Sequence, residues 1–455
     1  MTAPGRRARL AMLALALSLI ALAGVAGSAP PPVTDATPTR LVPQAIRLDD
    51  GRRFTLQLPE GYTISPAAQG LKRVRFFARS PDGRVFVTDM HDLSDNRRGA
   101  VHILDGWDAQ ANRFTRISQY LNGLRNPNSI AFHVDTQGRQ WLYLALTDRL
   151  VRYRYRDGDT APRSEAEVLA TFPDYGLSYK YGGWHLTRSI AFAGNGKLYV
   201  SVGSSCNACI EKESVRASIL EMNPDGSGQR VFARGMRNAV GLAVVDDRLL
   251  ATNQGADHLG RDRPDEALYR VEDGADYGWP YCYPSGRRVL ADPKFPRRRG
   301  CAGVPRPFAT FPAHASALGL AYFAEAPADS DSDVNSAPPG SEIDAPRHQR
   351  LAGSYLVALH GSTNRRIGHG YRLVRVGGDG RPLGDFILGF QQASGVVGRP
   401  CGILAFGSDA FLLSDDHRGV VYYVRPTLPQ ATPPPSTSPP STRPTPSSTG
   451  HTATP

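Results

Sequence analysis

The chain has 455 residues, of which 41% are hydrophobic and 21% are charged, with 46 glycines and 37 prolines. This composition is globular and rich in turns, and it excludes a disordered chain, a coiled coil and a polytopic membrane protein. The net charge is +11, but only five of the 53 basic residues are lysines. No run of five or more basic residues occurs, so nucleic-acid binding is not expected. The excess of arginine suits an anionic ligand, because a guanidinium group holds a carboxylate with two hydrogen bonds.

Residues 1–28 have the pattern of a secretory signal peptide. A basic start (Arg6, Arg7 and Arg9) precedes an apolar run over residues 10–25 and a group of small residues. The run is short for a membrane span, and no cysteine follows it that could carry a lipid anchor. We therefore expect export to the periplasm, the cell surface or the medium, with no stable membrane span once the leader is cleaved. An uncleaved leader that acts as an anchor stays open as an alternative.

The five cysteines are informative in an exported chain, where disulfides persist. The simplest count is two disulfides, Cys206 with Cys209 and Cys282 with Cys301, which leaves Cys401 as a free thiol. A CxxC motif can also bind zinc or carry out thioredoxin-like redox chemistry. Here no second CxxC, no histidine pair and no βαβ pattern accompanies it.

Residues 29–43 are rich in Pro and Thr and are predicted to be a linker. After them, a unit made of a Gly, Asp or Asn turn and a short apolar strand is repeated. Six copies stand at residues 80–87, 138–145, 194–201, 246–253, 353–359 and 407–414. They lie roughly 50 to 60 residues apart, except for one gap of about 106, and such periods are typical of propeller blades.

The long gap contains Cys282, Cys301 and an acidic, Pro-rich insertion at residues 325–346. We expect expanded loops there rather than a seventh blade. Several copies are preceded by another apolar strand, as in SIAFHV, VGLAVV and GILAFG, so each blade should contain adjacent antiparallel strands. The sequence therefore predicts an all-β, six-bladed β-propeller with long inter-blade loops over residues 44–425. Residues 426–455 are almost entirely Pro, Ser and Thr and are predicted to be a disordered spacer.

The polar residues that could carry chemistry lie in loops beside the predicted strands. His185 precedes the strand at 188–192, and Arg237 and Asn238 precede the one at 239–245. Further candidates at similar places are Arg75, His360, Arg365 and Arg399. A lone loop histidine or a surface arginine is more often structural. Their recurrence just before blade strands favours a site, because such side chains face one end of the channel.

A loop that includes Gly255, Ala256 and Glu266 mixes glycine with acidic and amide residues. Backbone and carboxylate oxygens of this kind could bind calcium, although the spacing is not that of an EF-hand. Solvated turn acids are the alternative.

Several motifs follow one another in a single order over most of residues 70–425. They are HLTRSIAF, SVGSSCNAC, NPDGSG, FARGMRNAVGLA, DYGWPYCY, LHGSTNR, GRPCGILAF and LLSDD. In this order they resemble the soluble glucose/L-sorbosone dehydrogenase family of quinoproteins, especially its sorbosone dehydrogenase-like branch. The resemblance implies a six-bladed propeller that binds pyrroloquinoline quinone (PQQ) and calcium. It also implies oxidation of the anomeric C1 hydroxyl of an aldose-type sugar to a lactone, with electrons passing to an external acceptor.

The resemblance assigns a role to each candidate. His185 matches the catalytic base, and Arg237 and Asn238 match the pair beside the reactive quinone carbonyl. The residues that match the surroundings of the cofactor carboxylates are Arg75, His360, Arg365 and Arg399. The backbone carbonyls of Gly255 and Ala256 match those that hold the calcium ion polarising the quinone, and Glu266 and Tyr277 match ligands of a second, structural calcium.

Two departures and two alternatives accompany this interpretation. Trp184 stands where glucose-oxidising members have Asp, and Thr363 stands where the sorbosone-like branch usually has Trp. One alternative is a catalytically silent propeller that serves as a sugar-binding or interaction module. Another is a calcium-dependent lactone hydrolase, which would need acidic metal ligands from several blades.

Overall fold

The computed structural model describes residues 40–173, 184–296, 300–325, 351–363 and 367–427. The chain divides into two units, residues 1–38 and 39–455, and all described residues belong to the second. The predicted leader, Arg365 and the predicted tail beyond residue 427 lie outside the described residues. The predicted linker ends inside a strand, since β1 (Leu41–Arg47) begins within it.

The first three blades are four-stranded antiparallel sheets, each built from consecutive strands. Blade 1 contains β4 (Val74–Arg79), β5 (Val85–Asp89), β6 (Gly99–Asp108) and β7 (Arg113–Leu124). Blade 2 contains β8 (Ser129–Val134), β9 (Gln140–Ala145), β10 (Arg149–Tyr155) and β11 (Glu167–Thr171). Blade 3 contains β12 (Arg188–Phe192), β13 (Leu198–Val202), β14 (Ser218–Met222) and β15 (Arg230–Arg234).

The last three blades carry the insertions. Blade 4 contains β16 (Ala239–Val245), β17 (Arg248–Asn253), β18 (Glu266–Val271) and β21 (Ala309–Phe311). Blade 5 contains β22 (Ala317–Phe323), β23 (Ser354–Leu359), β24 (Arg372–Gly377) and β25 (Pro382–Ile387). Blade 6 contains β28 (Pro400–Ala405), β29 (Phe411–Asp415), β30 (Val420–Pro426) and β3 (Tyr62–Ala68).

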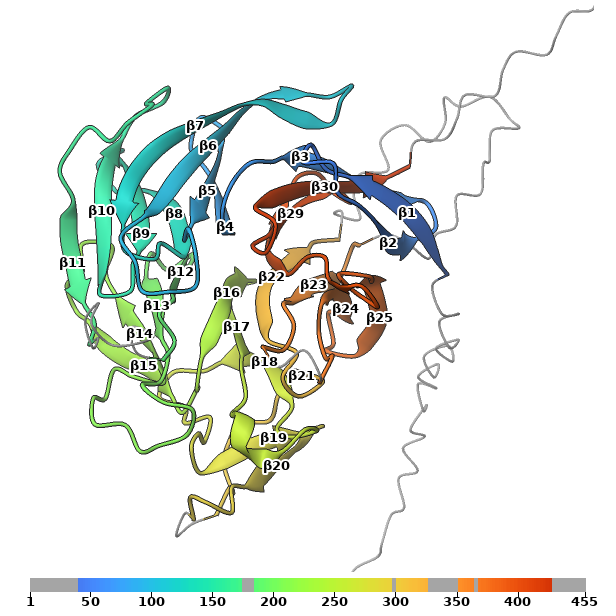
Figure 1. Cartoon of the computed structure of the whole chain (residues 1–455). Helices are drawn as coiled ribbons and strands as arrows, with labels where there is room; N and C mark the ends of the chain where they lie inside the picture. Colours follow the sequence, from blue (N-terminus) through green and yellow to red (C-terminus); the bar gives the residue numbers. More distant parts are fainter. Residues whose placement is uncertain (1–39, 174–183, 297–299, 326–350, 364–366, 428–455) are drawn as a thin grey trace, which may run out of the picture. The chain divides into compact units, whose positions relative to one another are not determined.

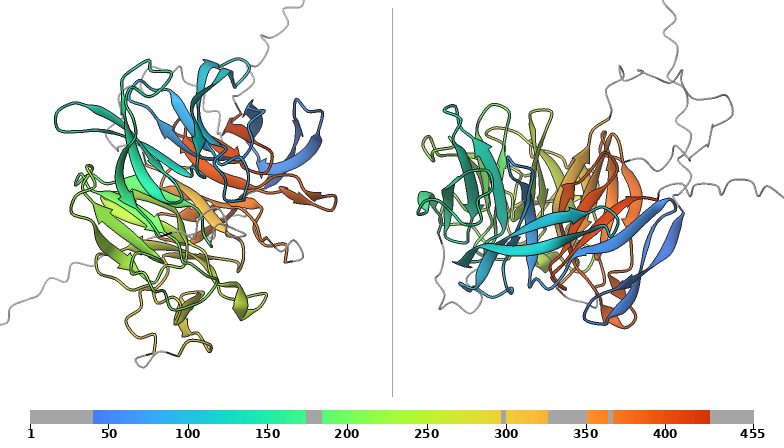
Figure 2. Two further views of the ribbon diagram at one scale, coloured as in Figure 1. Left: turned by 60° about the vertical axis from the view of Figure 1, so that its left-hand side comes forward. Right: turned by 90° about the horizontal axis from the view of Figure 1, so that it is seen from above.

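Three hairpins and one short helix lie outside the blades. The hairpins pair β1 with β2 (Arg53–Pro59), β19 (Cys282–Ser285) with β20 (Arg288–Ala291), and β26 (Gln391–Gln392) with β27 (Gly395–Val396). The helix is the 3₁₀ turn η1 (Asp257–Leu259), and it is the only helix in the described part of the chain. The β1–β2 hairpin lies beside the C-terminal blades, where Gln57 forms a bridge with Leu388 (Figure 2).

The innermost strands form a ring. Strands β4, β8, β12, β16, β22 and β28 each contact the next, and β28 contacts β4 (Figure 1). The ring is closed by a strand from the other end of the chain, because β3 pairs with β30 from Tyr62–Pro426 onward. The predicted all-β, six-bladed propeller is thereby confirmed. The six sequence repeats are the second strands of the blades, from β5 to β29, and the predicted strands before them are the innermost ones.

The long gap between the fourth and fifth repeats contains no additional blade in its described residues. It contains the two outer strands of blade 4 and the β19–β20 hairpin, which the Cys282–Cys301 disulfide secures. The Cys206–Cys209 disulfide is also present, and Cys401 is a free, buried thiol whose pKa burial raises to about 12. The predicted cysteine arrangement is therefore confirmed.

An apolar cluster fills the space between each pair of neighbouring blades. Phe86 of blade 1, for example, packs in the same cluster as Leu142 of blade 2, and the remaining five blade pairs repeat this arrangement. A smaller cluster on the innermost strands unites Val240, Leu318 and Cys401 at the axis. The innermost strands of blades 4, 5 and 6 therefore share an apolar contact of their own.

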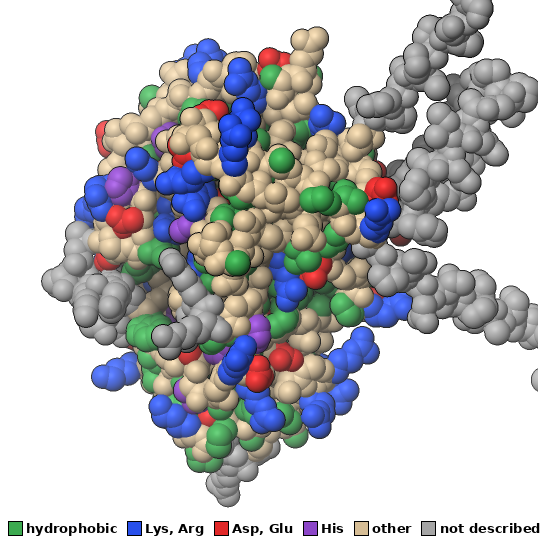
Figure 3. Space-filling view, turned by 45° about the vertical axis from the view of Figure 1, so that its right-hand side comes forward, with side chains coloured by type: hydrophobic (Ala, Val, Ile, Leu, Met, Phe, Trp, Pro, Cys, Tyr) green, Lys and Arg blue, Asp and Glu red, His purple; other side chains and the backbone are tan. Residues whose placement is uncertain are grey.

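The described residues contain no helix that is long and apolar enough to cross a membrane. On the face drawn in Figure 3, Lys and Arg side chains are spread widely and hydrophobic side chains form only small patches.

Candidate active site

The loops that enter the innermost strands bring most of the predicted residues to one end of the ring. His185 precedes β12, Arg237 and Asn238 precede β16, and Arg399 precedes β28. In an antiparallel pair, the start of one strand lies beside the end of the next. The residues that follow the second strands, such as His360 after β23, therefore reach the same end.

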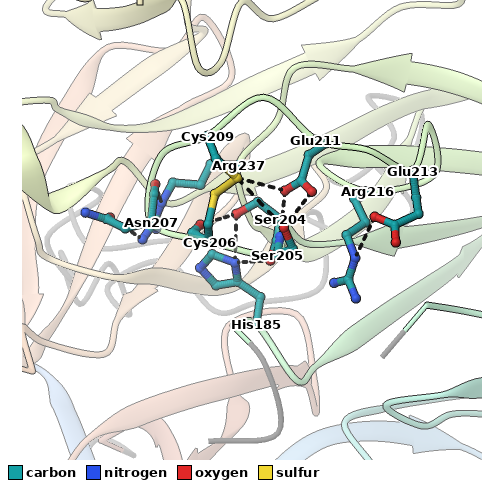
Figure 4. Close-up of a disulfide and its surroundings, with 10 residues drawn as sticks. All are labelled: His185, Ser204, Ser205, Cys206, Asn207, Cys209, Glu211, Glu213, Arg216 and Arg237. Carbon is teal, nitrogen blue, oxygen red and sulfur yellow. Dashed lines mark hydrogen bonds and ion pairs between the residues drawn. A yellow bond between two sulfur atoms is a disulfide. The ribbon is translucent and has the colours of Figure 1, made fainter. Parts of the chain in front are cut away.

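His185 has one ring nitrogen fixed by the loop that follows β13. Its Nδ1 lies 2.9 Å from the Ser204 carbonyl oxygen and 3.0 Å from the Ser204 hydroxyl (Figure 4). A carbonyl oxygen can only accept a hydrogen bond, so Nδ1 carries the proton. Nε2 then presents its lone pair, and no described residue forms a hydrogen bond with it. The geometry selects the tautomer that a proton acceptor needs.

The surroundings of His185 keep the imidazole neutral. Burial lowers its pKa well below the usual value, and the positive charge of Arg237 lowers it further. Arg188 and Arg216 act in the same direction, and only the hydrogen bond to Ser204 opposes them. A neutral imidazole with a free Nε2 is competent as a general base at neutral pH.

Arg237 and Asn238 are buried beside this histidine. Arg237 donates from Nε to the carbonyl oxygen of Asn207 at 2.8 Å, and from Nη2 to its Oδ1 at 2.9 Å. Asn238 donates from Nδ2 to Gln254 Oε1 at 2.9 Å, whereas its Oδ1 is buried and has no hydrogen-bond partner among the described residues. That oxygen is available to a hydroxyl or amide donor of a ligand.

Gly203 allows His185 and Asn238 to approach each other. A Cβ atom on Gly203 would lie 2.6 Å from Asn238 Oδ1 and 2.6 Å from the Cβ of His185. Any side chain at this position would therefore push the two groups apart.

A second cluster surrounds the buried carboxylate of Asp416, which follows β29. Arg75 Nη1 lies 2.7 Å from Asp416 Oδ2, while Arg73 Nη1 and His360 Nε2 lie 3.2 Å and 2.7 Å from Oδ1. These contacts hold the pKa of Asp416 far below its usual value despite its burial. Arg75 also donates from Nε to Asn128 Oδ1 at 3.0 Å. The Asp416 carboxylate is therefore the common partner of Arg73, Arg75 and His360.

Arg399 is a partly buried cation beside this cluster. It donates from Nη1 to the Gly361 carbonyl at 3.0 Å and from Nη2 to the Ser362 carbonyl at 3.1 Å. Burial lowers the pKa of His360, and Arg399 and Arg75 contribute to this shift. Burial and three arginines, Arg418, Arg399 and Arg73, likewise lower the pKa of His417 to about 4. Unprotonated histidines beside arginines indicate a positive local potential that favours an anion.

A cavity of about 480 Å³ is connected to both groups of residues through two of its lining residues, although His185, Arg237 and Arg399 do not line it. Asp257 lines it and lies 3.7 Å from Arg237, and Ser362 lines it and accepts from Arg399. The volume falls within the roughly 300–1,000 Å³ typical of ligand sites. Its lining residues are Asp257, Gly260, Arg261, His314, Ser362, Thr363 and Ile367.

The predicted metal residues fall into two environments. Gly255, Ala256 and Tyr277 line a cavity of about 20 Å³, which is large enough for one water molecule or ion. The Gly255 carbonyl accepts no hydrogen bond from any described residue. The hydroxyl of Tyr277 is used by the protein, since it donates to the Arg270 carbonyl at 2.7 Å.

Glu266 is buried at the start of β18, next to the loop of Gly255 and near the charge of Arg237. Backbone N–H groups of Ser316 and Gly255 donate to its carboxylate, but Oε2 is buried and has no hydrogen-bond partner among the described residues. Burial raises the pKa of Glu266 to about 8. A cation at Oε2 would satisfy this carboxylate as an ionised ligand, so Glu266 fits a calcium ion. Glu266 is absent from the lining of the cavity that contains Tyr277.

Sequence reasoning missed several residues of the site. Ser204 and Asn207 lie in the SVGSSCNAC motif and Asp416 lies in LLSDD, two motifs that carried only the family resemblance. The close group of Cys206, Cys209 and Glu211 is not a set of metal ligands, because the two sulfur atoms are bonded to each other. Trp184, which precedes the histidine, is 44% exposed and packs at 6.1 Å from its ring.

Comparisons with known proteins agree with this fold. The holo form of the pyranose dehydrogenase PQQ domain from Coprinopsis cinerea has a TM-score of 0.61 at 19% identity, covering 81% of this chain and 97% of that one. The calcium structure of a Trichoderma reesei enzyme of carbohydrate-active enzyme family AA12 has a TM-score of 0.62 at 15% identity, covering 81% and 96%. The PQQ-bound aldose sugar dehydrogenase from Streptomyces coelicolor has a TM-score of 0.53 at 20% identity, covering 81% and 99%.

A search of curated protein sequences found no match. The TrAA12-like family matches residues 56–386, which contain blades 1 to 5 almost to the end of β25 and strand β3 of blade 6. Since this is well over half of the sequence, the chain belongs to the TrAA12-like family.

Proposed function

We propose that this protein is a PQQ- and calcium-dependent sugar dehydrogenase that oxidises the anomeric C1 hydroxyl of an aldose-type sugar to a lactone. Its structural relatives include PQQ-bound sugar dehydrogenases and a calcium-bound AA12 enzyme. The observation that carries the proposal is the neutral His185, whose Nε2 is free because Ser204 accepts the proton of Nδ1. The resemblance to the sorbosone dehydrogenase-like branch supports an aldose-type substrate, but it does not name the sugar.

In this proposal the protein groups handle the proton and the developing charge. His185 Nε2 takes the proton of the C1 hydroxyl, while a hydride leaves C1 and the C1–O bond becomes a carbonyl. The quinone of PQQ, when bound, supplies the hydride acceptor. The buried guanidinium of Arg237 stabilises negative charge that develops nearby. An external acceptor is needed to remove the two electrons after each turnover.

The arginine cluster supports the binding of a cofactor with three carboxylates. Arg73 and Arg75 form ion pairs with a single ionised carboxylate, that of Asp416, and Arg399 lies 3.5 Å from the ring of His360, which also contacts that carboxylate. Burial is the main cause of the lowered pKa values of His360 and His417, and the neighbouring arginines lower them further. Ser362 lines the 480 Å³ cavity and accepts from Arg399, so Arg399 would hold one end of such a ligand.

Calcium is expected at two places. The Gly255 carbonyl and Ala256 would hold the ion that polarises the quinone, and Glu266 would bind a structural ion through Oε2. We further propose that the protein is exported, because residues 1–28 have a signal-peptide pattern.

The proposal is tested by anaerobic titration of the purified chain with PQQ and calcium, followed by a panel of aldoses while the quinone absorption is recorded. We expect saturable PQQ binding and bleaching by at least one sugar. His185→Gln should bind PQQ normally and lose bleaching by roughly 10²–10⁴-fold in rate. Sugar binding without PQQ would instead identify a silent binding module, and lactone hydrolysis without PQQ would identify a hydrolase.

A further inference from the structure

The loop that follows β13 contacts both His185 and Arg237. It leaves the blade at Gly203, and the Ser204 N–H donates to the Arg237 carbonyl at 2.8 Å. The Ser204 carbonyl accepts from His185 Nδ1 at 2.9 Å. One residue of the loop is therefore hydrogen-bonded to two separate parts of the candidate site (Figure 4).

The shape of this loop is fixed by a short network of cross-links. The Cys206–Cys209 disulfide closes a ring over three peptide bonds. The Glu211 carboxylate accepts from the Ser205 backbone N–H at 2.6 Å and from its hydroxyl at 2.7 Å. The Ser204 hydroxyl donates to the Cys206 carbonyl at 2.7 Å. Both half-cystines are only partly buried, so a solvent reductant can reach the bond.

Asn207 lies inside the disulfide ring and holds Arg237. Its carbonyl and side-chain oxygens accept from Nε and Nη2 of the guanidinium at 2.8 and 2.9 Å. Two bonds to one edge of the guanidinium fix the plane of the group. Asp257, more than half exposed, offers Arg237 only a looser ion pair at 3.7 Å, although its N–H also donates to Asn207 Oδ1 at 2.9 Å.

We propose that the disulfide-closed loop over residues 204–211 is the positioning element of the site, with Asn207 as the positioning residue for Arg237. This inference rests on the proposed function for its catalytic meaning, but its geometry concerns only the protein. Arg237 has no described contact that matches the two from Asn207. Opening the ring therefore releases the guanidinium from its place beside His185.

The consequence is measurable at His185 without any cofactor. The charged groups that lower the His185 pKa are Arg237 before β16, Arg188 on β12 and Arg216 before β14, with Arg237 the largest of the three. Release of Arg237 removes that contribution, so the His185 pKa rises towards its ordinary value. Arg188 and Arg216 stay in place, so they continue to lower the His185 pKa.

The test combines nuclear magnetic resonance titration of the histidine ring protons in the cofactor-free protein with steady-state kinetics of the loaded enzyme. His185→Gln identifies the resonance. Asn207→Ala removes the Oδ1 acceptor of Arg237 Nη2 and keeps the backbone acceptor of Nε. We expect the His185 pKa to rise in this variant, and kcat to fall roughly 10- to 100-fold with the sugar KM changed less than about threefold. Asn207→Asp keeps the acceptor atoms, so it should recover most of kcat while its negative charge raises the His185 pKa.

Reduction provides an independent arm. One thiol of a dithiol such as dithiothreitol attacks a sulfur of the Cys206–Cys209 bond, which forms a mixed disulfide and releases one cysteine thiol. The second thiol of the reagent then attacks the mixed disulfide and releases the other cysteine. Two electrons and two protons have then passed to the cystine, and the reagent has become a cyclic disulfide. The same rise in the His185 pKa should follow, with the two released thiols assigned by alkylation and mass spectrometry.

The matched control is the double variant Cys206→Ser, Cys209→Ser, which should show the raised pKa already and no further response to dithiothreitol. If the response persists in that variant, it comes from Cys282–Cys301 and the proposal is overturned. An unchanged His185 pKa in Asn207→Ala overturns it as well. A wild-type chain that binds no PQQ overturns the proposed function but leaves the titration result, and hence the positioning role, to be decided separately.

Discussion

His185 is oriented by a neutral carbonyl instead of by a carboxylate. A carboxylate partner would raise the histidine pKa, whereas the Ser204 carbonyl fixes the tautomer and adds no charge. The arginines around the ring then keep the imidazole unprotonated. The residue is therefore arranged to accept a proton over a wide range of pH.

This arrangement predicts the acid limb of the pH profile. Because the folded pKa of His185 lies well below its ordinary value, the unprotonated base persists as the pH falls, and kcat/KM should hold through the pH range in which an ordinary histidine becomes protonated. In Arg237→Gln the lowering charge is lost, so the decline should begin at a higher pH. Activity measured from pH 4 to 9 checks this, with Arg47→Gln on the exposed edge of β1 as the control. A profile that moves equally in both variants would contradict it.

We expect calcium to stabilise the protein through the buried carboxylate of Glu266. Its buried Oε2 has no hydrogen-bond partner among the described residues, so calcium should raise the Tm of the wild-type protein. Glu266→Gln replaces the carboxylate with a neutral amide and should lose most of that gain while remaining at least as stable in chelator. Thermal unfolding with and without calcium measures both effects. An undiminished calcium response in the variant would place the ion elsewhere.

The sequence predicted which residues gather at this end of the ring better than it predicted how they are held. His185, Arg237, Asn238, His360 and Arg399 could be found because each lies next to a recognisable blade strand. Asp416 also follows a recognisable strand, β29, but its partners could not be predicted because they come from other blades. Asn207 lies in a loop with no strand signal. Such contacts depend on long-range packing that no local pattern records.

At the scale of elements, the innermost strands of the last three blades approach one another at glycines. A Cβ on Gly241 would lie 2.1 Å from the Leu318 carbonyl oxygen, and Gly319 and Gly402 show the same crowding against the next innermost strand. Thr252 reinforces this seam by donating to the same Leu318 carbonyl at 2.8 Å. The loops of the site stand on these strands, so their spacing sets the spacing of the site.

Gly241→Ala should therefore destabilise the protein and disturb the site together. The added methyl group meets backbone atoms that cannot rotate away, so we expect a loss of about 1–3 kcal/mol and weaker PQQ binding. Chemical denaturation and PQQ titration measure the two quantities. Gly378→Ala, where the nearest atom is a backbone oxygen at 3.1 Å, is the matched control and should have a smaller effect on both quantities.

The second strand of every blade and the strand before it were predictable, because both are short apolar runs that flank a turn. The outer strands were less so: β7, β11 and β25 alternate with many exposed residues and resemble loops in composition. Blade 4 was the hardest to predict, since a long excursion with its own hairpin separates β18 from β21.

At the scale of the whole molecule, the ring depends on strand β3. Strand β3 supplies the outer edge of blade 6 by pairing with β30, and its Ala67 and Ala68 pack in the cluster between blades 6 and 1. No periodicity in the sequence revealed this closure, because a single strand at the start of the chain has no repeat unit to mark it.

Two truncations test the role of this strand. A chain that begins at Arg40 keeps β1, β2 and β3 and should unfold cooperatively with a Tm within a few degrees of that of the full chain. A chain that begins at Gly70 lacks β3 and should lose cooperative unfolding, because blade 6 is left with an unpaired edge and an exposed cluster. Calorimetry distinguishes the two outcomes, and a cooperative transition in the shorter chain would show that closure is dispensable.

The pairing of β3 with β30 also orders events during synthesis. Tyr62 leaves the ribosome hundreds of residues before its partner Pro426, so the strand waits without its neighbour while five blades and most of the sixth are made. Closing so long a loop is slow, and an open strand edge invites pairing with other chains. The arrangement makes completion of the ring a late, post-synthetic step, and places the risk of misassembly in the interval before it.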